Sequence, residues 1–319
     1  MVERTVHVGA PLWARVSSQI VRRLPRGRYR AMNWLCRGEP PTFIDVVPGS
    51  DRRLIFECDL RNTLAREVYF TGTYEPQATM LIREVLTQGQ VFVDVGANWG
   101  YFSLLSAGIV GGTGRVVAIE ADPRMYRTLA RNTALNSFPH LTSVHVAAAA
   151  KPGTLTLLGY SEEDTNWGLS RVVKDGGNGN GGKTFEVEAK PIDTILDEQR
   201  VDSVDLLKMD IEGAEGFALE GMRRGLASGR YRRIVLELHP DQLREHGQSA
   251  GDILRTLRDA GYRGWTIDHS LESLRRVAYG RNVGLRDFMA PLEKDSVTRE
   301  WPHVLLLADG VEPPPALLR

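Results

Sequence analysis

The chain has 319 residues, 42% of them hydrophobic and 25% charged, which is enough to bury one large core with an appendage. Its 40 basic and 40 acidic residues cancel, and this argues against general nucleic-acid binding because neutralising phosphates requires a basic surface. No apolar run reaches the roughly 20 residues that span a bilayer and no signal peptide is evident, so we expect a cytoplasmic protein.

The first predicted element is a basic amphipathic segment near the N-terminus. Between Glu3 and Glu39 the chain carries eight arginines, Arg22 and Arg23 among them, and no acidic residue. Apolar residues recur near helical spacing at positions 12, 13, 16, 20, 21 and 24. Such a helix can dock on an anionic lipid surface, on a partner or on a second copy of the chain, or it can pack on its own domain.

A small hairpin is expected next, ahead of the main domain. Its strands are predicted at 42–47 and 53–58, around the turn residues Pro48, Gly49 and Ser50. The basic helix and the hairpin together make residues 1–70 an N-terminal extension, and residues 71–319 are expected to form the main domain.

The strongest local signal is a strand that runs into a glycine turn. Val91 to Val95 form the short apolar run of a buried parallel strand, and Gly96 and Gly100 bracket a turn into a helix. Unless this turn only packs the helix on the strand, we expect its free N–H groups to face a ligand. Asn98 stands where a dinucleotide fingerprint has its middle glycine, so a pyrophosphate is not expected. S-adenosylmethionine, with ribose and adenine but no phosphate, fits better.

A carboxylate follows at the end of the next strand, predicted at 115–120. Glu120 lies 24 positions after Gly96, close to the spacing of about 20 residues at which an acidic side chain binds ribose hydroxyls. A carboxylate here could also cap the helix predicted at 123–136. Asp122 and Pro123 already make a good cap and first-turn pair, so we assign Asp122 to the cap and Glu120 to the ribose.

Charged residues gather at the ends of two later strands. In and after the strand predicted at 205–210, Lys208, Asp210 and Glu212 alternate, which places them on one side if the backbone stays extended. Buried charges are costly unless they are paired or functional. The alternative is a salt-bridged set at the start of the next helix, the role expected of Glu215.

The strand predicted at 233–238 brings a further pair of polar residues. Glu237 and His239 lie on a common face at its end, and we expect Pro240 to stop a helix there.

Strands and helices alternate through this region. Strands are expected at 91–95, 115–120, 142–147, 205–210, 233–238, 262–267 and 303–307, with helices from 100, over 123–136 and over 249–260. The alternation predicts an α/β, doubly wound, Rossmann-like sheet with ligand sites at the carboxyl ends of its strands. The alternation is interrupted at 153–158, at 166–168 and by a glycine-rich run at 175–182. The glycine-rich run is either a lid over a second ligand, the acceptor of a transferred group, or a disordered hairpin tip.

At this point the chain resembles the FkbM family of S-adenosylmethionine-dependent methyltransferases. The resemblance rests on Gly72 to Pro76, Asp94 to Gly100, the strand end at Glu120 and Leu207 to Glu215, in the family's order over roughly residues 70 to 240. It implies a class I methyltransferase core whose last strand is antiparallel, and an enzyme that usually methylates oxygen on sugars, macrolides or other secondary metabolites. Residues 1–40 and the C-terminal third are poorly covered.

On this resemblance and the residues above, we predict a set of ligand contacts. The expected cofactor contacts are Glu75, Asp94, Gly96, Ala97, Asn98, Gly100, Glu120, Ala121 and Asp210. The acceptor is expected to be a small molecule or glycan, with Trp167 and Glu237 as candidate contacts.

The chemistry follows from the cofactor. Its methyl group is already activated, so the protein must position an acceptor hydroxyl and remove its proton. We expect His239 to be the base because its ordinary pKa of about 6.5 suits proton removal near neutral pH. Asp210 and Glu212 are the rivals.

Two other functions remain open at this stage. Asp210 and Glu237, with or without His239, could hold Mg²⁺ and polarise the hydroxyl, although this ligand set is incomplete and we expect no metal. The chain could also be a non-catalytic nucleotide-binding or membrane-associated scaffold that uses Arg22 and Arg23.

Overall fold

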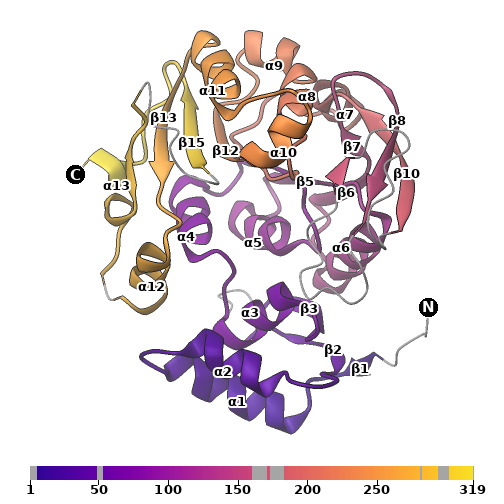
Figure 1. Ribbon diagram of the computed structural model, residues 1–319, viewed down its shortest axis with the longest axis vertical. Helices are drawn as coiled ribbons and strands as arrows, with labels where there is room; N and C mark the ends of the chain where they lie inside the picture. Colours follow the sequence, from indigo (N-terminus) through magenta and orange to yellow (C-terminus); the bar gives the residue numbers. More distant parts are fainter. Residues whose placement is uncertain are drawn as a thin grey trace.

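The computed structural model describes residues 6–48, 53–159, 171–172, 183–280, 282–293 and 302–318. Its largest feature is a sheet with the strand order β14-β13-β15-β12-β11-β4-β5-β6 (Figure 1). In chain order its strands are β4 (Val91–Val95), β5 (Arg115–Glu120), β6 (Leu141–His145), β11 (Leu206–Met209), β12 (Arg233–Glu237), β13 (Tyr262–Ile267), β14 (Met289–Pro291) and β15 (His303–Ala308).

The sheet is parallel over its larger part and antiparallel at one edge. β6, β5, β4, β11 and β12 pair in parallel. β15 lies antiparallel between β12 and β13, as the family resemblance implies for the last strand, and β14 is antiparallel to β13. The predicted α/β doubly wound sheet is thereby confirmed, and the strands expected at 91–95, 115–120 and 262–267 have the predicted bounds.

Helices cover both faces of this sheet. Successive side chains of a strand point to opposite faces, so in β4 Phe92 enters one buried cluster and Val93 the other. On the first face lie α4 (Pro76–Val85), α5 (Tyr101–Val110) and α6 (Pro123–Asn136). On the second face lie α7 (Ile192–Glu198), α8 (Glu215–Glu220), α9 (Arg223–Ala227), α10 (Pro240–Glu245) and α11 (Ala250–Asp259). Figure 1 shows the two groups on opposite sides of the sheet.

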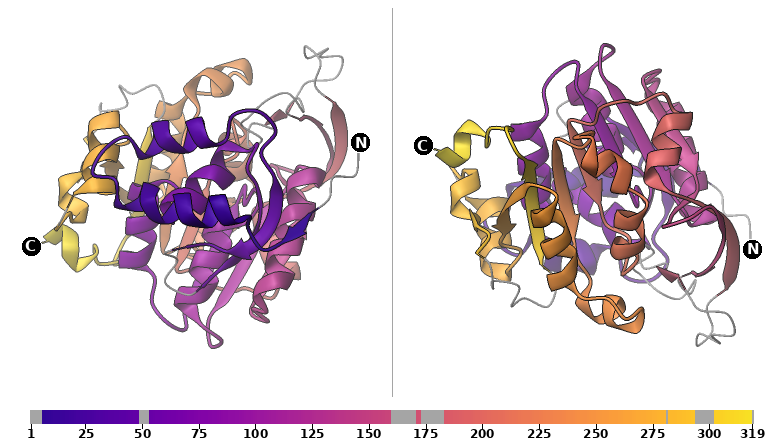
Figure 2. Two further views of the ribbon diagram at one scale, coloured as in Figure 1. Left: turned by 90° about the horizontal axis from the view of Figure 1, so that it is seen from below. Right: turned by 90° about the horizontal axis from the view of Figure 1, so that it is seen from above.

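The elements between His7 and Thr71 add a smaller layer beneath α4 and α5 (Figure 1). They comprise β1 (His7–Val8), α1 (Leu12–Arg23), α2 (Arg28–Leu35), β2 (Thr42–Val46), β3 (Ile55–Asp59) and α3 (Thr63–Thr71). β2 and β3 are antiparallel, which confirms the predicted hairpin, and β1 pairs with β2. α1 and α2 pack against α3 and lie side by side at one end of the molecule (Figure 2, left).

A second small sheet branches from the core after β6. Its strand order is β7-β10-β8-β9. The strands are β7 (Ala147–Ala148), β8 (Gly153–Leu158), β9 (Arg171–Val172) and β10 (Thr184–Lys190). The strand predicted at 142–147 is therefore divided between two sheets. Trp167 and the glycine-rich run at 175–182 lie outside the described residues.

The C-terminal part supplies the remaining elements. They are α12 (Leu271–Tyr279), the short 3₁₀ turn η1 (Leu285–Asp287) and α13 (Pro315–Leu318). α12 packs on α4. In the part of the chain that the structure describes, no helix is both long and apolar enough to cross a membrane.

The expectation that Pro240 stops a helix was wrong. Pro240 does not stop a helix but occupies the first position of α10. Proline suits this position because its missing N–H would have no partner in the first helical turn, and its fixed φ already matches the helix.

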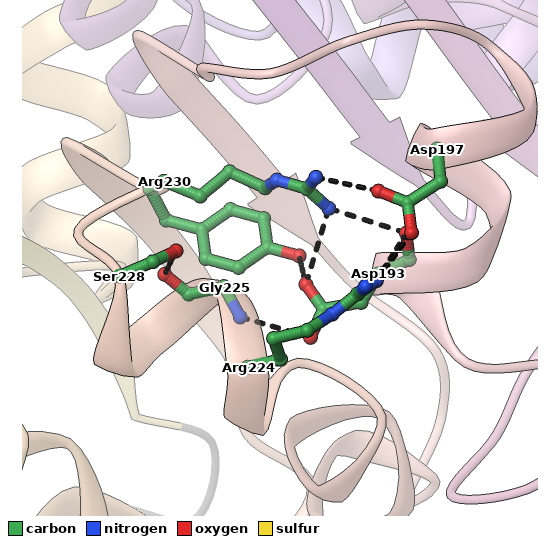
Figure 3. A network of polar contacts seen from close by, with 7 residues as sticks. Asp193, Asp197, Arg224, Gly225, Ser228 and Arg230 are labelled. Carbon is green, nitrogen blue, oxygen red and sulfur yellow. Dashed lines mark hydrogen bonds and ion pairs between the residues drawn. The ribbon is translucent and has the colours of Figure 1, made fainter.

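A buried polar network joins α7 to residues 225–231, which precede β12 in the chain (Figure 3). Asp193 accepts the hydroxyl of Tyr231 at 2.7 Å and the N–H of Gly225 at 2.9 Å. Arg230 lies 3.4 Å from Asp193 and 2.5 Å from Asp197. Asp193 is only 5% exposed, so its carboxylate depends on these partners.

Candidate functional site

A pocket opens where the carboxyl ends of β4, β5 and β11 meet. β4 lies between the other two strands, the arrangement at which parallel sheets commonly bind ligands. The pocket encloses about 960 Å³, its open mouth included. The predicted residues that line it are Gly96, Ala97, Asn98, Glu120, Ala121, Asp210 and Glu212. The fold thus brings together the glycine turn, the β5 strand end and the charged segment after β11.

The glycine turn is held by its own hydrogen bonds. The N–H groups of Gly96 and Ala97 donate to the carbonyl oxygen of Ile119 at 3.0 and 2.9 Å. The N–H groups of Gly96 and Ala97 are therefore not free to bind a ligand, because β5 already accepts their hydrogen bonds. Gly96 has a φ of +82°, and a Cβ at this position would lie 1.9 Å from the carbonyl oxygen of Asp210. Glycine is needed here because the turn passes so close to the end of β11.

Glu120 stands at the pocket with its carboxylate already positioned. The side chain accepts the N–H of Asn98 on Oε2 and the N–H of Asp122 on Oε1, both at 2.7 Å. Burial raises the pKa of Glu120 to about 7, although the two N–H donors lower it. A carboxylate can accept about four hydrogen bonds, so Glu120 can still accept hydroxyl donors from a ligand.

Asp122 caps α6 as predicted, accepting the N–H of Arg124 at 2.7 Å.

Behind the turn, a buried ion cluster connects β4 to β11. Lys208 Nζ lies 3.3 Å from Asp210 Oδ2 and 4.8 Å from the ring centroid of Phe102. Burial lowers the pKa of Lys208, but the neighbouring carboxylates outweigh burial and hold it above its usual range. Asp94 is 1% exposed and accepts the hydroxyl of Ser103 at 2.6 Å. Burial raises the pKa of Asp94, although Lys208 and the bond from Ser103 lower it.

The segment after β11 does not stay extended. β11 ends at Met209, and Glu212 has a left-handed φ of 51°. Even so, Lys208, Asp210 and Glu212 all line the pocket. Burial raises the pKa of Glu212 to about 7, against the lowering effect of His239.

His239 is surrounded by carboxylates. Its Nδ1 lies 2.7 Å from Glu215 Oε1, and its Nε2 lies 3.5 Å from Glu212 and 3.6 Å from Glu237. Burial lowers the pKa of His239, but the hydrogen bonds to Glu215 and Glu237 and the nearby charges outweigh it and raise the pKa to about 11. The ordinary pKa on which the expectation of a His239 base rests does not apply in this setting, because the imidazole is charged at neutral pH.

Glu237 connects His239 to a second histidine. Its Oε2 lies 2.9 Å from His303 Nε2. Burial raises the pKa of Glu237, but the two histidines outweigh burial and hold it well below its usual range. The ring of His303 stacks on His269 with centroids 3.6 Å apart, and burial lowers the pKa of His269 to about 3.

Five of the predicted site residues that the structure describes do not line the pocket. They are Glu75, Asp94, Gly100, Glu237 and His239. Glu75 precedes α4, and burial raises its pKa to about 7 against the effect of Lys208. His239 lies 3.8 Å from Asp210 and 3.5 Å from Glu212, which both line the pocket, and Glu237 lies 3.6 Å from His239.

Two groups of side chains have the spacing for a divalent cation. The ligand atoms of Asp210, Glu212 and His239 lie within 4.8 Å of one another, and so do those of Glu75, Asp210 and Glu237. Carboxylate oxygens suit Mg²⁺, whereas His239 would have to lose its proton before it could bind a metal. Asp210 and Glu237, the pair expected from the sequence, both belong to the second group, whereas His239 belongs to the first.

The contact by which Glu215 orients His239 was not predicted from the sequence. The residue is fully buried, and its Oε1 also accepts the N–H of Gly213 at 3.1 Å. The sequence predicts that Glu215 interacts with a helix dipole, and the residue does lie in the first turn of α8. Its contact with His239 joins positions 24 residues apart, for which no local pattern exists. Nor did any pattern indicate Leu64, which α3 contributes to the pocket.

Sequence comparisons found similar proteins. A family model described as the methyltransferase FkbM domain matches residues 94–263. The methyltransferase sdnD of Sordaria araneosa is 29% identical over 161 residues, which are 43% of this chain and 62% of that protein. The chain therefore spans less than two thirds of this relative.

Solved structures give a weaker likeness. The methyltransferase FkbM of Methylobacillus flagellatus KT is 18% identical with a TM-score of 0.42, over 77% of this chain and 53% of that one. Aeropyrum pernix fibrillarin, solved with natively bound S-adenosyl-L-methionine, is 14% identical with a TM-score of 0.36, over 72% of this chain and 73% of that one.

Proposed function

Because this chain belongs to the FkbM family of methyltransferases, we propose that it transfers the methyl group of S-adenosylmethionine to a hydroxyl of a sugar, glycolipid or secondary metabolite. The observation that carries the proposal is the pocket in which Glu120, Asp210 and Glu212 surround one space. In this proposal Glu120 accepts the ribose hydroxyls, Asp210 attracts the ammonium group of the methyl donor, and Glu212 takes a proton from the acceptor.

The residues present fit this donor. Glu120 keeps acceptor capacity for the ribose, and the buried Oδ1 of Asn98 has no hydrogen-bond partner, so a ligand donor can satisfy it. Met125, Val146 and Leu157 line the same pocket and offer an apolar wall for adenine. Bound in this way, S-adenosylmethionine supplies a methyl group that is already activated for transfer.

We assign the proton transfer to Glu212. A general base works best when its pKa lies near the working pH, and the pKa of Glu212 is about 7. Glu212 also lines the pocket, whereas His239, with a pKa of about 11, has no free base to offer at neutral pH. The imidazolium 3.5 Å away lowers the pKa of Glu212 and so keeps part of it ionised. His239 is then a positioning residue, fixed by Glu215.

Substitution of each candidate separates these roles. Glu212→Gln should lower turnover by about 10²–10⁴-fold, the usual contribution of a general base, and leave S-adenosylhomocysteine affinity nearly unchanged. In the native enzyme, turnover should rise with pH and level off above about pH 7, following the pKa of Glu212. Glu220→Gln is the matched control, since Glu220 is an exposed residue of α8. Transfer from labelled S-adenosylmethionine to a panel of glycans and secondary metabolites supplies the assay.

The possible outcomes discriminate among the residues. A turnover that keeps rising toward pH 11 and is lost in His239→Asn would assign the base to His239. Full activity in both variants would leave positioning alone to carry the reaction. A protein that binds S-adenosylhomocysteine but methylates nothing in the panel would support a non-catalytic role.

A divalent cation is the second candidate chemistry, favoured by the spacing of Asp210, Glu212 and His239. In that case a metal would acidify the acceptor hydroxyl in place of a protein base. EDTA should then abolish transfer and added Mg²⁺ should restore it. Under the metal-free proposal, activity is insensitive to EDTA.

A further inference from the structure

The N-terminal layer exposes an unusual number of large apolar side chains. Most of the strongly exposed ones in the described part of the chain lie on α1 and α2 rather than around the methyltransferase sheet. On these two helices the exposed fractions are Leu12 76%, Trp13 41%, Val16 49%, Ile20 57% and Trp34 64%. Scattered single apolar residues need no explanation, but a cluster of this kind marks an interaction surface.

On α1 the apolar stripe faces outward. With 3.6 residues per turn, Leu12, Trp13, Val16 and Ile20 fall within about 100° of the helix circumference. The buried face of the same helix consists of Ala14, Ser18 and Val21. A helix that served only its own domain would turn the larger apolar side chains inward. We call the outward residues Leu12, Trp13, Val16 and Ile20 the outer stripe.

Arginines accompany the outer stripe without acidic neighbours. Arg23, Arg26, Arg30 and Arg37 are exposed. Among the described residues no carboxylate pairs with any of them, whereas Arg15 pairs with Asp45 at 3.3 Å. The segment that contains α1 and α2 therefore carries uncompensated positive charge as well as its exposed apolar side chains.

We propose that the outer stripe and these arginines dock the protein on a bilayer with anionic headgroups. Apolar side chains of an amphipathic helix enter the boundary between headgroups and acyl chains, while flanking arginines contact phosphates. Trp34, 64% exposed, suits that boundary, where tryptophan is enriched, and so does the 41% exposed Trp13, although its ring also stacks on Phe70. A second copy of the same face would bring unpaired arginines against arginines, so charge complementarity favours the lipid. α1 and α2 form one end of the molecule, which leaves this face accessible (Figure 2, left).

Vesicle flotation with the full chain tests the proposal. Native protein should bind phosphatidylcholine vesicles that contain phosphatidylglycerol at least tenfold better than phosphatidylcholine alone, and added salt should weaken this binding. Val16→Ser combined with Ile20→Ser should weaken binding at least tenfold. Arg23→Gln combined with Arg26→Gln should weaken it about 25-fold, since each arginine near an anionic surface contributes roughly fivefold.

Matched variants keep the comparison specific. Leu271→Ser removes an exposed leucine from α12, and Arg223→Gln with Arg258→Gln removes two exposed arginines from α9 and α11. Both control variants should bind vesicles as the native protein does. All of these side chains are exposed, so the variants should keep the native melting temperature and S-adenosylhomocysteine affinity.

Three results would overturn the proposal. The first is equal binding to charged and uncharged vesicles. The second is loss of binding in the control variants to the same extent as in the stripe variants. The third is a dimer, measured by light scattering, that the stripe variants convert to monomers while no form binds vesicles, which would assign the outer stripe to a second copy of the chain.

Discussion

The affinity for S-adenosylhomocysteine should rise with pH as Glu120 ionises. Burial raises the pKa of Glu120 to about 7, so at pH 6 most molecules carry a neutral carboxyl group at this position. Ribose hydroxyls donate more strongly to a carboxylate than to a neutral acid. Binding therefore selects the ionised form, and protons compete with the ligand.

The pKa sets the size of this effect. For one group with a pKa of about 7, the dissociation constant should be about tenfold larger at pH 6 than at pH 8. The same shift affects folding of the ligand-free protein. Because the folded pKa lies above the ordinary 4.5, the stability that Glu120 contributes is fully present below pH 4.5 and is lost as the pH rises through about 7.

Titration calorimetry at pH 6, 7 and 8 and constant ionic strength measures the dependence. Glu120→Gln keeps the shape of the side chain but cannot ionise. At pH 8 this variant should bind about 10–100-fold more weakly, since a hydrogen bond to a charged group contributes about 1.5–3 kcal/mol. Glu75 and Glu212 also have pKa values of about 7, so the comparison is between the pH slopes of variant and native protein.

The tenfold change due to Glu120 should be missing from the variant. If Glu120→Gln instead retains the full pH slope and the native affinity at pH 8, then Glu120 only supports the turn at Asn98 and does not bind the ribose. Glu220→Gln should reproduce the native slope.

Three further predictions follow from the same geometry. Gly96→Ala should lower the free energy of unfolding in urea by more than about 2 kcal/mol and abolish S-adenosylhomocysteine binding. A left-handed φ alone costs about 1–2 kcal/mol, and the new Cβ also clashes with Asp210. The control Gly112→Ala, with no atom within 4 Å of the new Cβ, should stay within about 0.5 kcal/mol of native. Asp193→Ala should cost about 3–5 kcal/mol, because it leaves Arg230 and Tyr231 without their buried partner; a loss under 1 kcal/mol would show that water replaces the carboxylate. S-adenosylhomocysteine at 100 times its Kd should stabilise the fold by about 2.7 kcal/mol, while NAD, which carries a pyrophosphate, should leave the melting temperature unchanged; stabilisation by NAD alone would contradict the reading of the glycine turn.

The bounds of the core elements could be predicted because their signals are local. Asp122 and Pro123 mark the start of α6, and the apolar run at 91–95 marks β4. The pairing order of the strands has no such signal. The position of β15 between β12 and β13 depends on contacts between distant segments, so only the family resemblance indicated its direction. The split of 142–147 between two sheets likewise depends on β10, which lies about 40 residues further along the chain.

The site could be predicted in its residues but less well in its chemistry. Motif spacing placed Glu120, Asp210 and Glu212 at one pocket, because the carboxyl ends of parallel strands meet at one edge. The pKa of His239 could not be foreseen, because it belongs to the cluster rather than to the side chain. Glu215, Glu212 and Glu237 come from different segments, and only their convergence raises that pKa to about 11.

Backbone strain adds an independent reason to place function at this pocket. Three of the non-glycine residues with left-handed backbone lie at or beside it, with φ values of 40° at Glu75, 52° at Asn98 and 51° at Glu212. Asparagine tolerates this conformation through local hydrogen bonds, but glutamate does not, and each such residue costs on the order of 1–2 kcal/mol. Glycine would relieve the strain at positions 75 and 212 and would lose the carboxylate. The strained backbone therefore holds acidic groups where unstrained geometry would not place them, next to Asp210 and the charged ends of β11 and β12.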